Sequence, residues 1–204
     1  MDGQDYLNQI SQSNRPVIKK ENKLLSSKLL LFGVGAVILL FIVIIIGAIL
    51  SGNKGGEKNL SIRLLLHLDN TSTLVQEYQP SIKSSNLRSN SASLYSVLTN
   101  TSRELTTFLE EKYAFNSKDA EANIVEEADL DKDNLETELF NAKINGLLDR
   151  TFAHKMAYEI AIFLAEESKL LNSTSDASLK SIIETSHESL ENLYDNFDNF
   201  SEAD

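Results

Sequence analysis

The chain has 204 residues, a formal net charge of −11 and 42% hydrophobic residues, and it contains no cysteine. The absence of cysteine excludes disulfides, thiolate metal sites and a lipoprotein thioether anchor. This length fits one modest globular domain, together with a separate segment that raises the hydrophobic content.

The first 50 residues predict a tail followed by a membrane span. Residues 1–28 are rich in Asn, Gln, Ser and Lys, so we expect a flexible cytoplasmic tail. Residues 29–50 read LLLFGVGAVILLFIVIIIGAIL, which is 22 residues without a charge, amide or hydroxyl. A helix of that length measures roughly 33 Å and can cross a hydrocarbon core of about 30 Å.

We interpret the apolar segment as an uncleaved signal anchor. Cleavable signals have apolar regions of roughly 7–15 residues and a small-x-small exit, whereas Leu50 stands here where a second small residue should fall. Basic residues are more frequent before the span than just after it, which favours a cytoplasmic N-terminus. Five precede it and three follow: Arg15, Lys19, Lys20, Lys23 and Lys28 against Lys54, Lys58 and Arg63.

One face of the span is a candidate contact surface. Helices associate in lipid by close packing, and small residues let their backbones approach. Residues on this face recur at intervals of three and four, with glycine at both ends: Gly33, Ala36, Leu40, Val43 and Gly47. The absence of a Gly-x-x-x-Gly pair favours the alternative, in which the span serves only as an anchor.

Residues 51–58 contain three glycines and predict a short flexible tether, and residues 59–204 form the domain. This domain holds 12 basic and 26 acidic residues, a net charge of −14, which repels nucleic acid and anionic lipid. Its only proline and only glycine are Pro80 and Gly146, so long helices are expected.

Apolar residues at intervals of three and four predict five helices in this domain. Together with the N-terminal span they predict an all-α protein, with one transmembrane helix followed by an antiparallel four- to five-helix bundle. The helices are expected from Leu60 to Tyr78 before Pro80, from Leu87 to Phe108, from near Ser117 to Gly146, from a cap at Asp149 through Phe152 to Leu164, and from Leu179 to Phe197.

The run Asp129-x-Asp131-x-Asp133 resembles the start of a calcium-binding loop. Such a loop needs Gly at its sixth position and Glu at its twelfth, where Asn134 and Phe140 stand. A helical apolar stripe also continues through the acidic run, which favours the solvated face of a helix. The stripe consists of Ile124, Ala128, Leu135 and Leu139.

One Glu-x-x-His motif occurs, at Glu184 and His187. Di-iron bundles use two such motifs and two further glutamates, and neither His67 nor His154 has a Glu three residues before it. We therefore expect no metal or cofactor, with Glu184 and His187 as the candidate ligands of a metal-binding alternative. No phosphate loop or nucleophile elbow is present, so we expect a protein that is not an enzyme.

Several segments resemble a family of single-span membrane proteins of unknown function from ultrasmall, host-dependent bacteria. They are MDGQDYLNQISQSNRP, YQPSIKSSNLRSNSASLYSVLTNTSRELT and LFNAKINGLLDRTFAHKMAYEI. More distantly, LLDRTFAHKMAYEIAIFLAEE and LKSIIETSHESLENLY are similar to an exported ferritin-like bundle family of unknown function. That family tends to carry a histidine late in the first of these helices, where this chain has Tyr158 and Glu159.

We expect a membrane-anchored protein of the cell envelope, with its N-terminus inside the cytoplasmic membrane and a helical bundle outside it. The bundle would be an interaction or structural module. The alternative is a ferritin-like bundle that binds a metal or a small ligand. The expected partners are the lipid bilayer, through residues 29–50, and an envelope or surface protein, but not nucleic acid.

Overall fold

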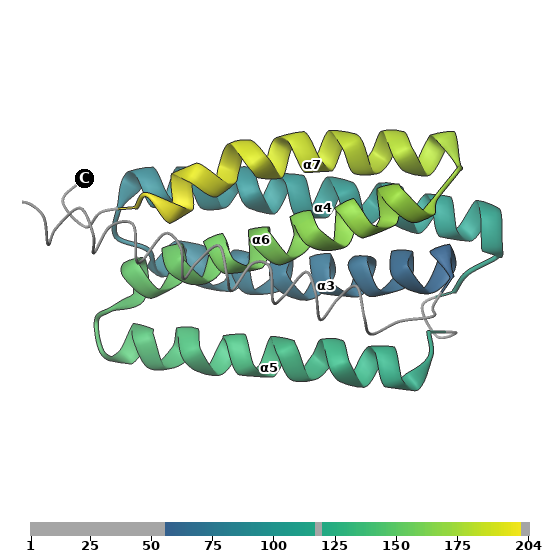
Figure 1. Ribbon diagram of the computed structural model, residues 1–204. Coiled ribbons are helices and arrows are strands. Elements are labelled where there is room, and N and C mark those ends of the chain that lie inside the picture. The colour runs from purple at the N-terminus through teal and green to yellow at the C-terminus, as the bar shows by residue number, and fades with distance from the viewer. Residues whose placement is uncertain (1–55, 117–119, 201–204) are drawn as a thin grey trace, which may run out of the picture. The chain divides into compact units, whose positions relative to one another are not determined.

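The computed structural model describes residues 56–116 and 120–200, and throughout these ranges every regular element is a helix (Figure 1). The all-α domain predicted from the apolar stripes is confirmed. Its elements are α3 (Glu57–Tyr78), the short 3-10 helix η1 (Gln79–Ser81), α4 (Ser85–Tyr113), α5 (Ala122–Ile144), α6 (Leu148–Ser173) and α7 (Ala177–Asp198).

Four of these helices form a bundle, and the fifth lies against its side (Figure 1). Helices α3 and α7 occupy opposite corners, and each packs against both α4 and α6. Short connections make consecutive helices run antiparallel. Helix α5 packs only against α3 and α6 among its substantial contacts, so its outer side has no helical neighbour in the described part of the chain.

The core consists of the apolar stripes that the sequence predicts. Phe152 and Phe163 of α6 and Phe197 of α7 are completely enclosed, and leucines from α3, α4 and α5 surround them. Burial of each such side chain stabilises the fold by about 1.5–3 kcal/mol before the cost of ordering the chain. The fully enclosed leucines of α3, α4 and α5 are Leu64, Leu68, Leu74, Leu87, Leu94, Leu98, Leu105, Leu109 and Leu139.

The helices end where the backbone requires it. Pro80 lies in η1 directly after α3, because proline cannot continue the hydrogen bonding of a helix. Gly146, at φ 73°, takes up the left-handed conformation predicted for it after α5. At the start of α7, Asp176 accepts hydrogen bonds from the backbone N–H groups of Ser178 and Leu179.

Two details of the expected helices are wrong. Helix α5 begins at Ala122 and not near Ser117. Asp149 does not cap α6, because the turn at Gly146 lets the helix begin at the buried Leu148 and places Asp149 in the first turn. Its carboxylate accepts hydrogen bonds from the backbone N–H groups of Lys83, at 3.0 and 3.1 Å, and Ser84, at 2.7 Å, just before α4.

Glu57 joins three parts of the fold at the opposite end of the bundle. One carboxylate oxygen accepts hydrogen bonds from Lys112 Nζ at 2.6 Å and from the Tyr113 hydroxyl at 2.7 Å. The other accepts one from the Thr174 hydroxyl at 2.5 Å. Burial raises the pKa of Glu57, but the hydrogen bonds from Lys112, Thr174 and Tyr113 together hold it below its ordinary value. Glu57 therefore links α3 to the end of α4 and to the α6–α7 turn.

No helix within residues 56–116 and 120–200 is both long enough and apolar enough to cross a membrane. The predicted span at residues 29–50 lies outside the described residues. So do its candidate contact residues Gly33, Ala36, Leu40, Val43 and Gly47. Helix α3 includes the last two residues of the predicted tether.

Candidate functional site

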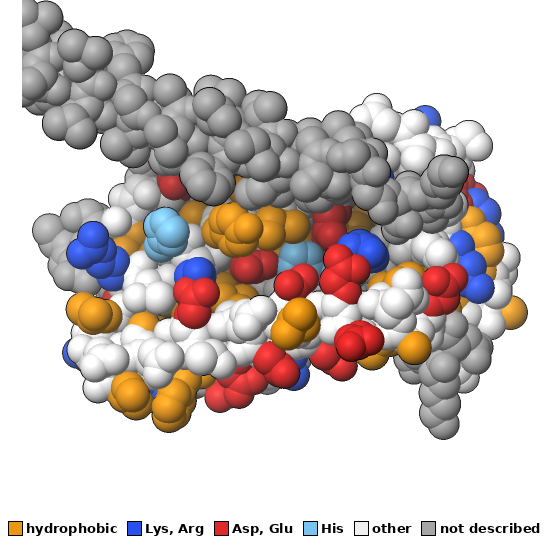
Figure 2. Space-filling view, turned by 60° about the horizontal axis from the view of Figure 1, so that its bottom comes forward, with side chains coloured by type: hydrophobic (Ala, Val, Ile, Leu, Met, Phe, Trp, Pro, Cys, Tyr) orange, Lys and Arg blue, Asp and Glu red, His pale blue; other side chains and the backbone are white. Residues whose placement is uncertain are grey.

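A cavity of about 340 Å³ opens between α3, α5 and α6. The space-filling view of this side shows acidic side chains gathered around a histidine (Figure 2). Apolar side chains also line the cavity, so it offers both charged groups and a surface for a carbon skeleton. The lining residues that carry the following argument are Arg63, His67, Glu127, Asp131, Glu138, Lys155, Glu159 and Glu166.

His67 of α3 lies between two glutamates of α6. Its Nε2 is 2.8 Å from Glu159 Oε2, and its Nδ1 is 3.1 Å from Glu166 Oε2. The two glutamates are seven residues apart, which is about two helical turns, so their carboxylates can reach opposite sides of one imidazole ring. The ring also packs against Phe163, with 4.4 Å between ring centroids.

The two carboxylates keep His67 protonated. Burial lowers the pKa of His67, but the charge of Glu166 and the hydrogen bond to Glu159 outweigh burial and raise the pKa to about 10. At neutral pH the ring is therefore an imidazolium, and each of its N–H groups donates to a carboxylate. The side chains of His67, Glu159 and Glu166 are 17, 12 and 14% exposed, which makes this ion cluster largely buried.

The mouth of the cavity holds further charges, most of them paired. Arg63 of α3 pairs with Glu127 of α5 at 2.7 Å, and Lys155 of α6 pairs with Glu138 of α5. Asp131 of α5 is exposed at this mouth and makes no hydrogen bond or ion pair with the described residues. Burial raises the pKa of Asp131, the imidazolium of His67 opposes that shift, and the carboxylates around the cavity add to it.

A second polar pair lies inside the bundle. Glu167 of α6 is completely buried, and its Oε2 is 3.1 Å from Nδ1 of His187 on α7. Glu167 Oε1 and the buried hydroxyl of Ser186 make no hydrogen bond of normal geometry with the described residues, although the hydroxyl lies close enough to oppose the rise in the pKa of Glu167. Burial raises the pKa of Glu167 to about 8, so its carboxyl group is mostly protonated at neutral pH.

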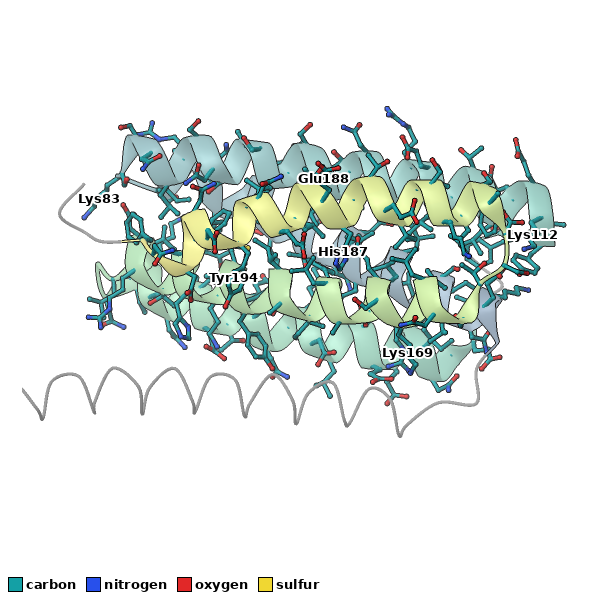
Figure 3. All side chains as sticks on the ribbon, turned by 45° about the horizontal axis from the view of Figure 1, so that its top comes forward. Lys83, Lys112, Lys169, His187, Glu188 and Tyr194 are labelled. Atoms are coloured by element: carbon teal, nitrogen blue, oxygen red, sulfur yellow. The ribbon has the colours of Figure 1, made fainter. Side chains whose placement is uncertain are left out.

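The structure separates the two residues that the sequence singles out. Glu184 is exposed on α7, and no hydrogen bond or ion pair between described residues joins it to His187. Figure 3 shows His187 on the side of α7 that faces α6, with Glu188 pointing away from it. The Asp129-x-Asp131-x-Asp133 run lies in the middle of α5, which confirms the predicted helix in place of a calcium loop.

The charged groups do not fit a metal centre. Within the described ranges, no group of three or more His, Asp or Glu side chains is arranged to hold a metal ion. A histidine ligates a metal through a ring nitrogen that carries no proton, whereas both nitrogens of the His67 imidazolium donate to carboxylates. The arrangement is instead suited to binding an organic cation beside its excess carboxylates.

Sequence reasoning missed the cluster of His67, Glu159 and Glu166. The relevant signal is the spacing of Glu159 and Glu166, which bracket the apolar run from Ile160 to Ala165 in α6. A second signal is Glu167, which follows Phe152, Met156, Ile160 and Phe163 on the buried stripe of α6. Carboxylates at buried positions of this kind mark polar sites inside a fold.

Comparison with known proteins assigns no family to the chain. No protein-family model, no curated protein and no solved structure matches it. The resemblances to a single-span membrane protein family and to a ferritin-like family therefore stay predictions. The geometry of the cavity is the observation from which a function is inferred.

Proposed function

We propose that the bundle is a binding module of the cell envelope that takes up a small organic cation, such as a diamine or polyamine, between α3, α5 and α6. The observation that carries the proposal is the carboxylate of Asp131, which lines the cavity without a partner beside two further glutamates. No reaction is required of the site, and we propose that the protein is not an enzyme.

The charges around the cavity favour a cation. Five carboxylates face three basic groups, and two of those basic groups are used by the pairs Arg63–Glu127 and Lys155–Glu138. The imidazolium of His67 neutralises one charge of its two glutamates, so two negative charges remain with that of Asp131. An ammonium group would form charge-assisted hydrogen bonds with these carboxylates.

The remaining walls fit an aliphatic chain. Ile124 and Leu135 of α5 and Ile162 of α6 supply apolar contacts beside the carboxylates. Tyr158 stands at the cavity with 46% of its surface exposed, and its ring can contact a cation. The volume of about 340 Å³ lies at the lower end of the range for small-molecule sites.

We propose that the module is displayed by the apolar segment at residues 29–50, with the N-terminus in the cytoplasm and the bundle outside. The supports are the length of that segment and the excess of basic residues before it. Protease added to intact cells, after removal of any wall barrier, should then digest residues 59–204 and spare the tail. Survival of the intact domain would contradict this topology.

A ligand titration of the full-length chain in detergent micelles tests the cation site. Spermidine and putrescine should raise the melting temperature at constant ionic strength, whereas citrate should not. At a hundred times the dissociation constant, the expected stabilisation is about 2.7 kcal/mol. Zn²⁺, Fe²⁺ and Ca²⁺ form a separate arm, in which a shift that depends on Glu184 and His187 would favour the ferritin-like metal alternative.

Two variants on the same helix make the titration specific. Asp131→Asn removes the unpaired carboxylate and should weaken polyamine binding about tenfold, the effect of losing one charged hydrogen bond. Asp129 is exposed as Asp131 is, but it does not line the cavity, so Asp129→Asn should bind as the wild type does. Equal weakening in both variants would show that the acidic surface attracts cations without a site.

A further inference from the structure

Helix α5 has apolar contacts with the bundle at its two ends and none in its middle. It buries four of its 23 residues, whereas α3 buries ten of 22 and α6 buries ten of 26. Ile124 is buried near its start, and Leu135, Leu139 and Ala142 are buried in its second half. Between these two groups every side chain is partly or fully exposed, so residues 125–134 do not belong to the core.

The same stretch, residues 125–134, forms the wall of the cavity on the α5 side. Polar contacts hold it to α3: Glu127 pairs with Arg63, and the backbone carbonyl of Ala128 accepts a hydrogen bond from Asn70 Nδ2 at 3.0 Å. Partly exposed ion pairs and single hydrogen bonds contribute little to stability, so this stretch can shift without disrupting the core. Its lining residues are Glu127, Ala128, Asp131 and Asn134.

Like charges face each other across the cavity. Asp131 lies on the α5 side, and Glu159 and Glu166 lie on the α6 side. Partial burial is the first cause of the raised pKa of Asp131, and the imidazolium of His67 opposes it, but the charges of Glu159 and Glu166 add to it. The two walls therefore repel each other. Since His67 neutralises one of the three carboxylates, two negative charges remain, divided between α5 and α6.

We infer that residues 125–134 are a strap that closes over the cavity when a ligand with two ammonium groups binds both walls at once. One ammonium group pairs with Asp131 and the other with Glu159 and Glu166, so attraction through the ligand replaces the repulsion between the walls. The acidic groups of the cavity are visible from outside in Figure 2, whereas small-molecule sites enclose about 70–90% of the ligand surface. Movement of the strap toward α6 supplies this enclosure.

The strap sets a requirement on the ligand. This inference rests on the proposed cation site, and it narrows the ligand of that site to a dication. Putrescine and butylamine share the same carbon chain, but putrescine ends in two ammonium groups and butylamine in one. Putrescine neutralises both of the charges that remain in the cavity, whereas butylamine leaves one wall charged and does not draw the strap toward α6.

Spin labels on the full-length chain in lipid nanodiscs measure the movement, because the native chain has no cysteine that would also take up the label. One label is attached at Asp129→Cys on the strap, outside the cavity lining, and the other at Glu188→Cys, which points away from the bundle on α7 (Figure 3). Double electron–electron resonance should give a shorter and narrower distance distribution with putrescine, and no change with butylamine. A control pair, Ser96→Cys on α4 with Glu188→Cys, should keep its distance with either ligand.

The resonances of His67 in the same samples report whether the ligand is bound. Saturation at His67 with an unchanged strap distance would overturn the strap and leave the cation site standing. Absence of any response at His67 would overturn the cation site, and the closure fails with it. Asp131→Asn removes the charge from the α5 wall and should abolish the shift. Closure by butylamine as complete as by putrescine would overturn the two-sided bridge, and an equal shift in the control pair would overturn a movement confined to the strap.

Discussion

Glu166 and Glu167 are neighbours on α6 with opposite surroundings. Glu166 faces α3 and shares the imidazolium of His67 with Glu159, whereas Glu167 faces α7 and leaves one oxygen without a hydrogen bond. Adjacent residues on a helix point about 100° apart, so one step along the chain separates the edge of a cavity from the interior of the bundle. Removing the partner of a buried charge should therefore destabilise the fold, whereas removing the ionisable group of a buried carboxyl that lacks a full set of partners should not.

The largest effect is expected from removing the cation of the paired cluster. His67→Leu leaves Glu159 and Glu166 largely buried without their common partner, so the free energy of unfolding should fall by about 3–5 kcal/mol at pH 7. Urea denaturation followed by circular dichroism measures the change. His154→Leu, at an exposed position on α6, is the control and should change the free energy of unfolding little. A loss below 1 kcal/mol for His67→Leu would show that the cluster is not a buried ion pair.

The next effect is a loss of stability with rising pH. The pKa of His67 is raised from 6.5 to about 10, so its contribution is complete below pH 6.5 and disappears as pH rises toward 10. The pKa of Glu167 is raised from 4.5 to about 8, so the folded state also holds a proton that the unfolded chain releases above pH 4.5. Both groups therefore make stability fall between pH 7 and 9, by roughly 4 kcal/mol in total, most of it from His67.

Urea midpoints measured across this range should show that fall, and two variants should divide it. His67→Leu should remove the dependence that extends toward pH 10. Glu167→Gln should remove only the part that ends near pH 8. A stability that rises between pH 7 and 9 would mean that neither group holds its proton in the folded state.

A smaller change of the opposite sign is expected at Glu167. Replacement by Gln keeps the shape, removes the group that ionises, and adds N–H donors that can reach the unpaired hydroxyl of Ser186. Stability at pH 8 should rise by about 1–2 kcal/mol. Glu166→Gln is the matched variant and should destabilise the protein, because His67 loses the charge of one partner. If Glu167→Gln and Glu166→Gln changed the free energy of unfolding in the same direction, the two glutamates would not differ in the way proposed.

The smallest effect is expected at the mouth of the cavity. Arg63 and Glu127 pair at 2.7 Å, but their side chains are 33 and 54% exposed. Exposed ion pairs contribute little, so Arg63→Met should change stability by no more than about 0.5 kcal/mol. It should strengthen polyamine binding, since it frees a carboxylate beside the cavity. Thermal melting with and without spermidine measures both quantities, and weaker binding would count against the cation site.

The helices were predictable from the sequence because each buries a continuous apolar stripe. The paired cluster was not, because His67 meets its partners 92 and 99 residues further along the chain, and only the packing of α3 on α6 brings them together. The cap expected at Asp149 is wrong for a local reason: the turn at Gly146 starts α6 at Leu148, two residues before the start that a cap at Asp149 implies. The surroundings of Glu167 were predictable in part. Its position in the apolar stripe of α6 indicates burial, but its contact with His187 follows only from the packing of α6 against α7.

The most direct measurement of the cation site is a nuclear magnetic resonance titration of the three histidine side chains with spermidine at pH 7. His67 lies in the cavity, His154 is exposed on α6, and His187 faces Glu167 inside the bundle. The resonances of His67 should already be those of an imidazolium and should shift to saturation, while those of His154 stay fixed. A neutral His67 ring, or equal shifts at His67 and His154, would contradict a cation site between α3, α5 and α6.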